Sequence, residues 1–195
     1  MTLETLALVV FCLAAVPAMM TLWNLLIFRA PRQAPADRSP AISVLIPARN
    51  EQDNIARVVE SACASRGVEL EVIVLDDHSD DGTAEVVRQL AARHPEVHLR
   101  QAPPLPDGFN GKQHACSVLA GLASNDILVF VDADVRLHER ALADLAAHME
   151  RHGLDLVSGF PRQLTGSLGE RLLIGLIHVV LLGFLPIAWM RKKPS

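Results

Sequence analysis

Segments of strand length and segments of helical periodicity alternate along the middle of this chain, and this alternation constrains its fold most strongly. Apolar runs predict strands at 42–46, 70–75, 97–100, 127–131 and 154–158. Residues with one apolar face predict helices at 53–64, 83–93, 112–123 and 139–151. Such alternation is typical of a mostly parallel sheet with helices on both faces. The sequence therefore predicts an α/β domain at 42–165, preceded by a proline-rich linker at 30–41.

Residues 6–28 form an apolar segment without a charged side chain, long enough to cross a hydrocarbon core of about 30 Å. A cleaved signal peptide would have a basic start and a shorter apolar stretch, so we interpret residues 1–29 as a transmembrane anchor. Arg29, Arg32 and Arg38 follow this segment. Because basic residues favour the cytoplasmic side, they predict that the α/β domain faces the cytoplasm at the inner membrane.

A second apolar segment spans residues 172–190 and is followed by a basic cluster at 191–193. Its length permits a membrane span, but a single crossing would place the basic cluster outside, against the positive-inside tendency. An interfacial or re-entrant helix avoids this conflict, and the glycines and Pro186 within the segment suit a bent helix. Both interpretations stay open, and residues 166–195 are assigned as a membrane-associated or second transmembrane segment.

Composition limits the classes of partner. The formal net charge is −4, and the α/β part contains no basic cluster, which argues against nucleic acid as the main partner. Half of the residues are hydrophobic (50%), enough for a sizeable core. Cys12, Cys63 and Cys116 are widely spaced and form no CxxC pair, so they predict neither a disulfide nor a zinc framework.

The fourth predicted strand ends in two aspartates one residue apart, Asp132 and Asp134. Residues two apart in a strand project to the same face, so we expect both carboxylates to leave the strand in one direction. Hard divalent cations take oxygen ligands and bind through one or two protein carboxylates, with substrate phosphates and water at their other positions. The pair therefore predicts a metal-bridged diphosphate.

Polar clusters also follow the first and second predicted strands, at 47–51 and 76–83. The carboxyl ends of parallel strands meet at one edge, where sheets of this type bind their ligands. We interpret residues 80–83 as a turn and helix cap, because Asp and Gly favour turns and acidic groups suit a helix N-terminus. A turn does not account for Asp76 and Asp77, which are therefore candidate ligand-binding residues.

Together these segments resemble family 2 glycosyltransferases of the GT-A type, over residues 42 to about 160. The segments Pro-Ala-Arg-Asn-Glu, Asp-Asp-x-Ser-x-Asp-Gly-Thr and Asp-x-Asp occur in the family's order and approximate spacing. The resemblance implies a Rossmann-like GT-A domain. It also implies a donor-binding site made of Pro47, Arg49, Glu51, Asp76, Asp77, Lys112 and Asp132.

The resemblance further implies a role for individual residues of this site. Asp77 would hydrogen-bond the nucleobase of a nucleotide sugar, and Asp134 would hold Mg²⁺ or Mn²⁺ on the diphosphate. Asp132 would face the ribose or the metal. Lys112 would approach the phosphates, although Cys116 follows where family members usually carry an asparagine shortly after the alanine. The alternative for Lys112, a solvated lysine in the first turn of a helix, stays open.

The implied reaction is inverting transfer of a sugar from a nucleotide-diphospho-sugar, a UDP-sugar by preference, to an acceptor hydroxyl. The apolar segments favour a lipid or polyprenoid acceptor. Residues 104–112 resemble those of bacterial membrane glycosyltransferases linked with hopanoid or carotenoid pathways. In the family, the catalytic base and a Gln-x-x-Arg-Trp type segment lie further downstream. We therefore expect a fragment, a truncated reading frame or half of a split enzyme, with the base beyond Ser195.

Two alternatives come from other classes of protein. One is a non-catalytic, membrane-anchored binder of nucleotide sugars. The other is a haloacid-dehalogenase-like phosphatase, with Asp132 as nucleophile and Asp134 as acid. Motif order opposes the phosphatase, because that fold places its aspartate motif on the first strand, followed by a lysine and a second acidic pair. In this chain the acidic pair Asp76 and Asp77 lies upstream.

Overall fold

The computed structural model of the chain describes residues 2–28, 31–35, 38–159 and 161–190. The chain divides into two compact units. Unit 1 combines Met1–Ala30 with Phe160–Ser195, and unit 2 is Pro31–Gly159. The predicted strands and helices of the α/β domain fall in unit 2, whereas both apolar segments fall in unit 1.

Unit 2 is built on a four-stranded sheet with the strand order β3-β2-β1-β4 and parallel pairing at each neighbour. Its strands are β1 (Ala41–Ala48), β2 (Glu69–Asp76), β3 (Val97–Gln101) and β4 (Ile127–Phe130). The central pair is in register along its whole length, from Ala41 opposite Glu69 to Ala48 opposite Asp76. The carboxyl ends of β1 and β2 therefore lie side by side, and the predicted parallel α/β fold is confirmed.

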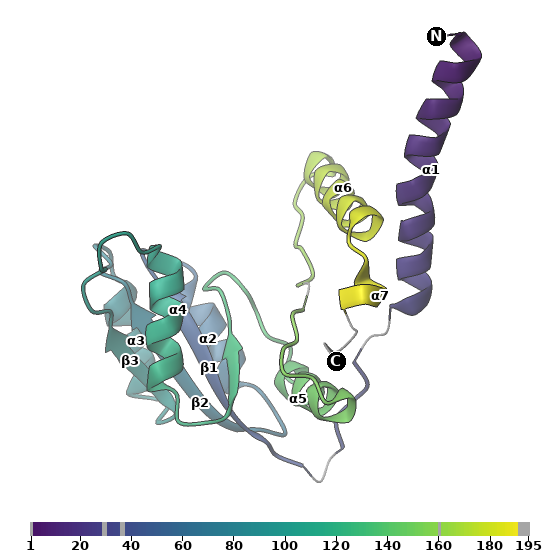
Figure 1. Cartoon of the computed structure of the whole chain (residues 1–195). Helices are drawn as coiled ribbons and strands as arrows, with labels where there is room; N and C mark the ends of the chain where they lie inside the picture. Colours follow the sequence, from purple (N-terminus) through teal and green to yellow (C-terminus); the bar gives the residue numbers. More distant parts are fainter. Residues whose placement is uncertain (1, 29–30, 36–37, 160, 191–195) are drawn as a thin grey trace. The chain divides into compact units, whose positions relative to one another are not determined.

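Helices cover both faces of this sheet. They are α2 (Ile55–Cys63), α3 (Thr83–Ala91), α4 (Gly111–Leu122) and α5 (Ala141–His152). Alternate residues of β1 point to opposite faces: Val44 packs into a core shared with α2, α3 and α5, whereas Leu45 packs against Ala115 and Leu119 of α4. Figure 1 shows α4 in front of the strands and α2 behind them. The two covered faces explain why the strands read as almost continuous apolar runs.

The predicted strand at 154–158 is wrong. Residues 154–159 contain no strand, and Leu156 is 86% exposed. Gly153 ends α5 in the left-handed conformation (φ 56°), and the Leu154 N–H donates to the Met149 carbonyl, so the segment begins as a helix cap. A strand also needs a neighbour, and in the described part of the chain β4 pairs with β1 alone.

Unit 1 contains α1 (Leu3–Ile27), α6 (Leu168–Phe184) and α7 (Ile187–Met190). Among the described residues, α1 is the one helix long and apolar enough to cross a membrane. The second apolar segment is broken at Pro186, between α6 and α7, as the bent-helix interpretation predicted. With 17 residues, α6 is about 26 Å long, at the lower end of the length that crosses a membrane, so both interpretations stay open. Arg29 and the basic cluster at 191–193 lie outside the described residues.

Helices α1 and α6 pack against each other through small and polar residues. Gly183 lies against α1 so closely that a Cβ atom there would come 3.2 Å from the Pro17 Cβ atom. The buried Asn24 amide donates to the carbonyls of Leu182 and Leu185, both at 2.7 Å. Carbonyls at a helix C-terminus have no partner within the helix, so Asn24 satisfies the end of α6. Small residues and amide side chains are common at helix contacts in membranes.

Candidate functional site

A cavity of about 460 Å³ lies at the carboxyl edge of the sheet in unit 2. It is lined from four segments of the chain: Pro47, Ala48, Arg49 and Glu51 at the end of β1, Asp77 after β2, Gly111, Lys112 and Ala115 in α4, and Asp132, Ala133 and Asp134 after β4. The volume falls within the range of about 300–1,000 Å³ that is typical of small-molecule sites. Its position is where parallel α/β sheets bind their ligands.

The loop after β1 is fixed by hydrogen bonds to the loop after β2. The Asn50 N–H donates to the Ser79 hydroxyl at 3.0 Å, and the Asp80 N–H donates to Asn50 Oδ1 at 2.9 Å. Asn50 has φ 55°, a conformation that Asn tolerates better than most residues. The Glu51 N–H donates to the Thr83 hydroxyl at 2.9 Å. These contacts hold Arg49 and Glu51, which flank Asn50, in place at the cavity.

Residues 80–83 form a turn and cap, as predicted. The backbone N–H and the hydroxyl of Thr83 both donate to Asp81, which lies just before α3. Asp81 also accepts from the Gln52 N–H at 3.2 Å, so it joins the two loops. The hydrogen bond from the Thr83 hydroxyl, supported by the backbone N–H groups, lowers the pKa of the Asp81 carboxyl.

The adjacent aspartates Asp76 and Asp77 have different environments. Asp76 is 3% exposed, and its carboxylate accepts from the Ser79 N–H at 3.2 Å. The structure does not place Asp76 in the cavity lining, and its carboxylate holds the turn after β2 instead. Asp77 is half-buried and lines the cavity, with its own N–H donating to the Ala48 carbonyl at 2.8 Å. A side chain at Gly111 would place its Cβ atom 3.7 Å from the Asp77 Oδ2 atom.

Asp132 and Asp134 both line the cavity, as expected of a pair that leaves the strand in one direction, but they follow β4 in a turn and are not part of the strand. The last hydrogen bond to β1 runs from the Val131 N–H to the Leu45 carbonyl at 3.0 Å. The chain then turns, and the Val135 N–H donates to the Asp132 carbonyl at 3.1 Å. Because β1 continues to its end without β4 beside it, this departure leaves space at the edge of the sheet. The two carboxylates reach that space from a turn.

Lys112 lies in the first turn of α4, which Asn110 caps by accepting from the N–H groups of Lys112 and Gln113. The Lys112 ammonium is 2.7 Å from Asp132 Oδ1, and the two side chains are 65% and 57% exposed. The hydrogen bond to Asp132 raises the pKa of Lys112. Exposed ion pairs of this kind contribute about 0–1 kcal/mol. Lys112 is therefore exposed but paired. An anionic ligand can replace Asp132 as the partner of its ammonium group at little cost in free energy.

The carboxylates of Asp132 and Asp134 fit a hard divalent cation. Both are exposed at the cavity and offer oxygen ligands, which Mg²⁺ and Mn²⁺ prefer. Asp132 already binds one positive group of this chain, the Lys112 ammonium. The roles of these residues in metal and donor binding stay predictions.

Sequence reasoning missed the small residues of the cavity. Ala48, Ala115 and Ala133 line it between the charged side chains and are 3%, 2% and 5% exposed. Larger side chains at these positions would fill the space that a ligand needs. The signal in the sequence is weak: an alanine at a strand end, one in the first turns of a helix, and one between two aspartates.

Residues 43–178 match the family model described as Glycosyl transferase family 2. Because this match covers well over half of the chain, the protein belongs to that family. The resemblance seen in the sequence is thereby confirmed. Family membership argues against the phosphatase alternative.

Two curated relatives are similar to this chain in sequence. A 4,4'-diaponeurosporenoate glycosyltransferase of Staphylococcus haemolyticus is 38% identical over 54% of this chain and 28% of its own length. Glycosyltransferase AglE of Haloferax volcanii is 30% identical over 62% of this chain and 39% of its own length. The chain therefore spans well under half the length of these relatives.

Solved structures agree on the fold. A mannosyltransferase of Pyrobaculum calidifontis in complex with GDP-Man and Mn²⁺ superposes with a TM-score of 0.62 and 23% identity, over 76% of this chain and 44% of its own. TarS 1-349 of S. aureus in complex with UDP superposes with a TM-score of 0.51 and 25% identity, over 66% and 39%. These neighbours confirm the GT-A fold.

Proposed function

We propose that unit 2 binds a nucleotide-diphospho-sugar together with a divalent cation at the carboxyl edge of its sheet, and that the protein transfers the sugar to an acceptor. One observation carries the proposal. The cavity gathers both basic and acidic side chains from four separate segments of the chain, namely Arg49, Glu51, Asp77, Lys112, Asp132 and Asp134. Support also comes from structural neighbours whose complexes contain GDP-Man with Mn²⁺, or UDP.

The charges in the cavity favour a nucleotide that arrives with a cation. Four acidic and two basic side chains line it, so a bare diphosphate would meet an excess of negative charge. A divalent cation at Asp132 and Asp134 offsets that excess, and this arrangement explains why donor binding should depend on the metal. Bound there, Mg²⁺ or Mn²⁺ would stabilise the negative charge that builds on the departing diphosphate.

We assign each remaining residue a role that its position supports. Asp77 is half-buried at the cavity wall, where its carboxylate accepts hydrogen bonds from the N–H groups of a nucleobase. Arg49 offers the planar donors that bind phosphate oxygens in pairs. Lys112 exchanges Asp132 for a phosphate oxygen when the donor enters. Pro47 and Glu51 complete the wall on the side of β1.

The reaction we infer is an inverting displacement. The acceptor hydroxyl attacks the anomeric carbon of the sugar and loses its proton to a carboxylate base. The bond from that carbon to the diphosphate oxygen breaks, and the nucleoside diphosphate leaves. Stabilising the charge on this leaving group is the contribution that the cavity side chains can make.

The acceptor we propose is a lipid or polyprenoid. Relatives named for 4,4'-diaponeurosporenoate support an apolar acceptor, and α1 supports work at a membrane surface. Arg32 and Arg38 follow α1, which agrees with unit 2 facing the cytoplasm at the inner membrane.

A binding experiment tests the proposal. The full chain in detergent is titrated calorimetrically with UDP-glucose and GDP-mannose, in Mn²⁺, in Mg²⁺ and in EDTA, and sugar transfer and donor hydrolysis are assayed in parallel. We expect at least one donor to bind, at least about tenfold more tightly with a cation, which is a difference of about 1.4 kcal/mol. Donor binding with neither transfer nor hydrolysis would leave a non-catalytic binder. No donor affinity under any condition would overturn the site.

A further inference from the structure

We propose that Cys63, His94 and Glu96 form a second metal site, for a borderline-soft divalent cation such as Zn²⁺. One possible ligand atom from each residue lies within 4.8 Å of those of the other two. This is the one such group of three found in the part of the chain that the structure describes. Sulfur, nitrogen and oxygen ligands in one cluster are typical of zinc sites.

The site lies at the amino edge of the sheet, opposite the donor cavity. Cys63 is the last residue of α2, which runs back from the carboxyl edge, and His94 and Glu96 precede β3. The backbone around the two later ligands is fixed: the Val97 N–H donates to the His94 carbonyl at 3.0 Å, and the Val72 N–H donates to the Glu96 carbonyl at 2.9 Å. The sheet therefore fixes the backbone at these two residues without a metal.

The geometry needs only a small side-chain movement to hold a cation. A tetrahedral Zn²⁺ ion keeps its ligand atoms about 3.3–3.6 Å apart, given bond lengths of about 2.0–2.3 Å. His94 Nδ1 and Glu96 Oε1 are already 3.5 Å apart. Their side chains are 34% and 27% exposed, and Cys63 is half-buried, so a cation can reach the cluster and water can take a fourth position.

Charge and ligand type select the cation. A thiolate and a carboxylate together balance the two positive charges of Zn²⁺, so a half-buried site becomes neutral when the cation binds. Thiolate and imidazole ligands favour Zn²⁺ over Mg²⁺ and Mn²⁺. The oxygen ligands of Asp132 and Asp134 have the opposite preference. We therefore expect the two edges of the sheet to bind different metals.

The same residues also account for how the Cys63 thiol is held when no metal is bound. Burial, reinforced by the nearby negative charge of Glu96, raises the pKa of the Cys63 thiol to about 12. Without a cation the thiol keeps its proton and hydrogen-bonds Glu96. When Zn²⁺ binds, an S–Zn bond replaces the S–H bond, and the proton passes to solvent.

Absorption spectroscopy tests the site, because a Co²⁺–thiolate bond gives a charge-transfer band that oxygen-ligated Co²⁺ lacks. Co²⁺ is added to the full chain in detergent, and Zn²⁺ is then titrated in to displace it. We expect a near-ultraviolet band that saturates at one Co²⁺ per chain, disappears on adding Zn²⁺ and is absent from Cys63→Ser. Glu96→Gln, which keeps the side-chain shape, should weaken Co²⁺ binding at least about tenfold, because even partners outside the ligand set typically contribute that much.

Matched variants keep the result interpretable. Cys116→Ser and Cys12→Ser remove the other two thiols, and both should retain the band. Far-UV circular dichroism establishes that Cys63→Ser and Glu96→Gln are folded. Saturating Zn²⁺, at about a hundred times its dissociation constant, should raise the melting temperature by about 5–10 °C in the wild type. No band in the wild type, or an equal band in folded Cys63→Ser, would overturn the proposal and leave only a thiol–carboxylate hydrogen bond.

Discussion

The packed faces of the sheet and its carboxyl edge differ in most of their physical properties. Leu45 on one face is 0% exposed and surrounded by apolar side chains, whereas the Asp132 side chain at the edge is 57% exposed and surrounded by charges. The faces bury apolar area, which stabilises the fold. The edge displays polar groups whose partners are ligands. The comparison teaches that stability and ligand binding reside in different residues of unit 2 and can be changed separately.

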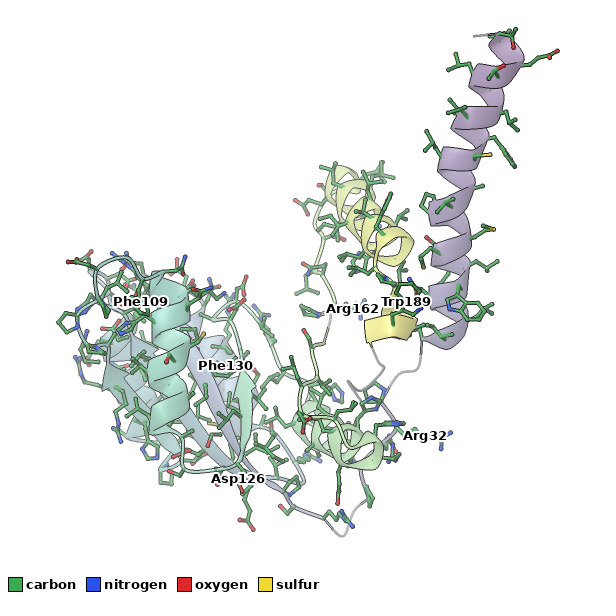
Figure 2. The ribbon with its side chains drawn as sticks, in the orientation of Figure 1. Arg32, Phe109, Asp126, Phe130, Arg162 and Trp189 are labelled. Carbon is green, nitrogen blue, oxygen red and sulfur yellow. The ribbon has the colours of Figure 1, made fainter. Side chains whose placement is uncertain are left out.

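The largest effect is expected at the edge. Asp134→Ala should abolish the Mn²⁺-dependent part of nucleotide binding, because it removes a carboxylate from the proposed metal site, while the melting temperature stays close to that of the wild type. Calorimetric titration with and without Mn²⁺ measures the change. The control is Asp126→Ala, an exposed aspartate just before β4 at the other end of the sheet (Figure 2). Unchanged Mn²⁺-dependent affinity in Asp134→Ala would remove this residue from the site.

The opposite result is expected on a packed face. Leu45→Ala should lower the free energy of unfolding by about 2–5 kcal/mol, because it leaves a cavity under α4. The nucleotide affinity of the folded fraction should not change. Urea unfolding followed by circular dichroism measures the loss, and Leu156→Ala, at a side chain that is 86% exposed, is the control. A donor affinity that falls with stability would contradict the separation of the two regions.

A smaller effect is expected for Lys112→Gln, which should weaken donor binding about tenfold, or about 1.4 kcal/mol. The loss is limited because the lysine contributes one mobile charge to the diphosphate. Arg88→Gln is a well-matched control: the Arg88–Glu85 pair is also 2.7 Å long, with both side chains 60% exposed. Equal donor affinity in the wild type and Lys112→Gln would show that Lys112 takes no part in donor binding.

The smallest effect is expected in how the melting temperature falls at acidic pH. Because the folded state lowers the pKa of Asp81 below its ordinary value of 3.8, this group stabilises the fold above pH 3.8 and stops doing so as the pH falls through the lowered pKa. Asp81→Asn should therefore flatten the loss of melting temperature below about pH 4. Thermal melts across this range measure it, with Asp107→Asn as the control for the loss of one charge. If Asp81→Asn and Asp107→Asn lost melting temperature equally below about pH 4, the lowered pKa of Asp81 would be refuted.

Local patterns predicted most of the fold. The apolar runs that became β1, β2 and β3 were found within two residues, because strands buried on both faces leave a strong signal. The run at 154–158 has similar composition but no strand beside it in the described residues. Strand pairing depends on residues distant in sequence, so composition alone could not reveal this difference.

The sequence predicted some residues of the site and not others. The rule that ligands bind at the carboxyl ends of strands correctly brought Arg49, Asp77 and Asp134 to one cavity. It could not distinguish Asp77 from Asp76, because neighbouring residues point in different directions and only the folded turn shows which one faces the cavity. Cys63 and His94 have no motif spacing, so their proximity appears only once α2 and β3 are in place.

The contact between α1 and α6 has a consequence for the order in which the protein is made. Asn24 and Leu185 lie 161 positions apart in the chain, and all of unit 2 is encoded between them. During synthesis all of unit 2 is translated before α6, and domains generally fold as units. The contact between α1 and α6 can therefore form only after nearly the whole chain has been translated, and until then the Asn24 amide lacks its partners at the end of α6.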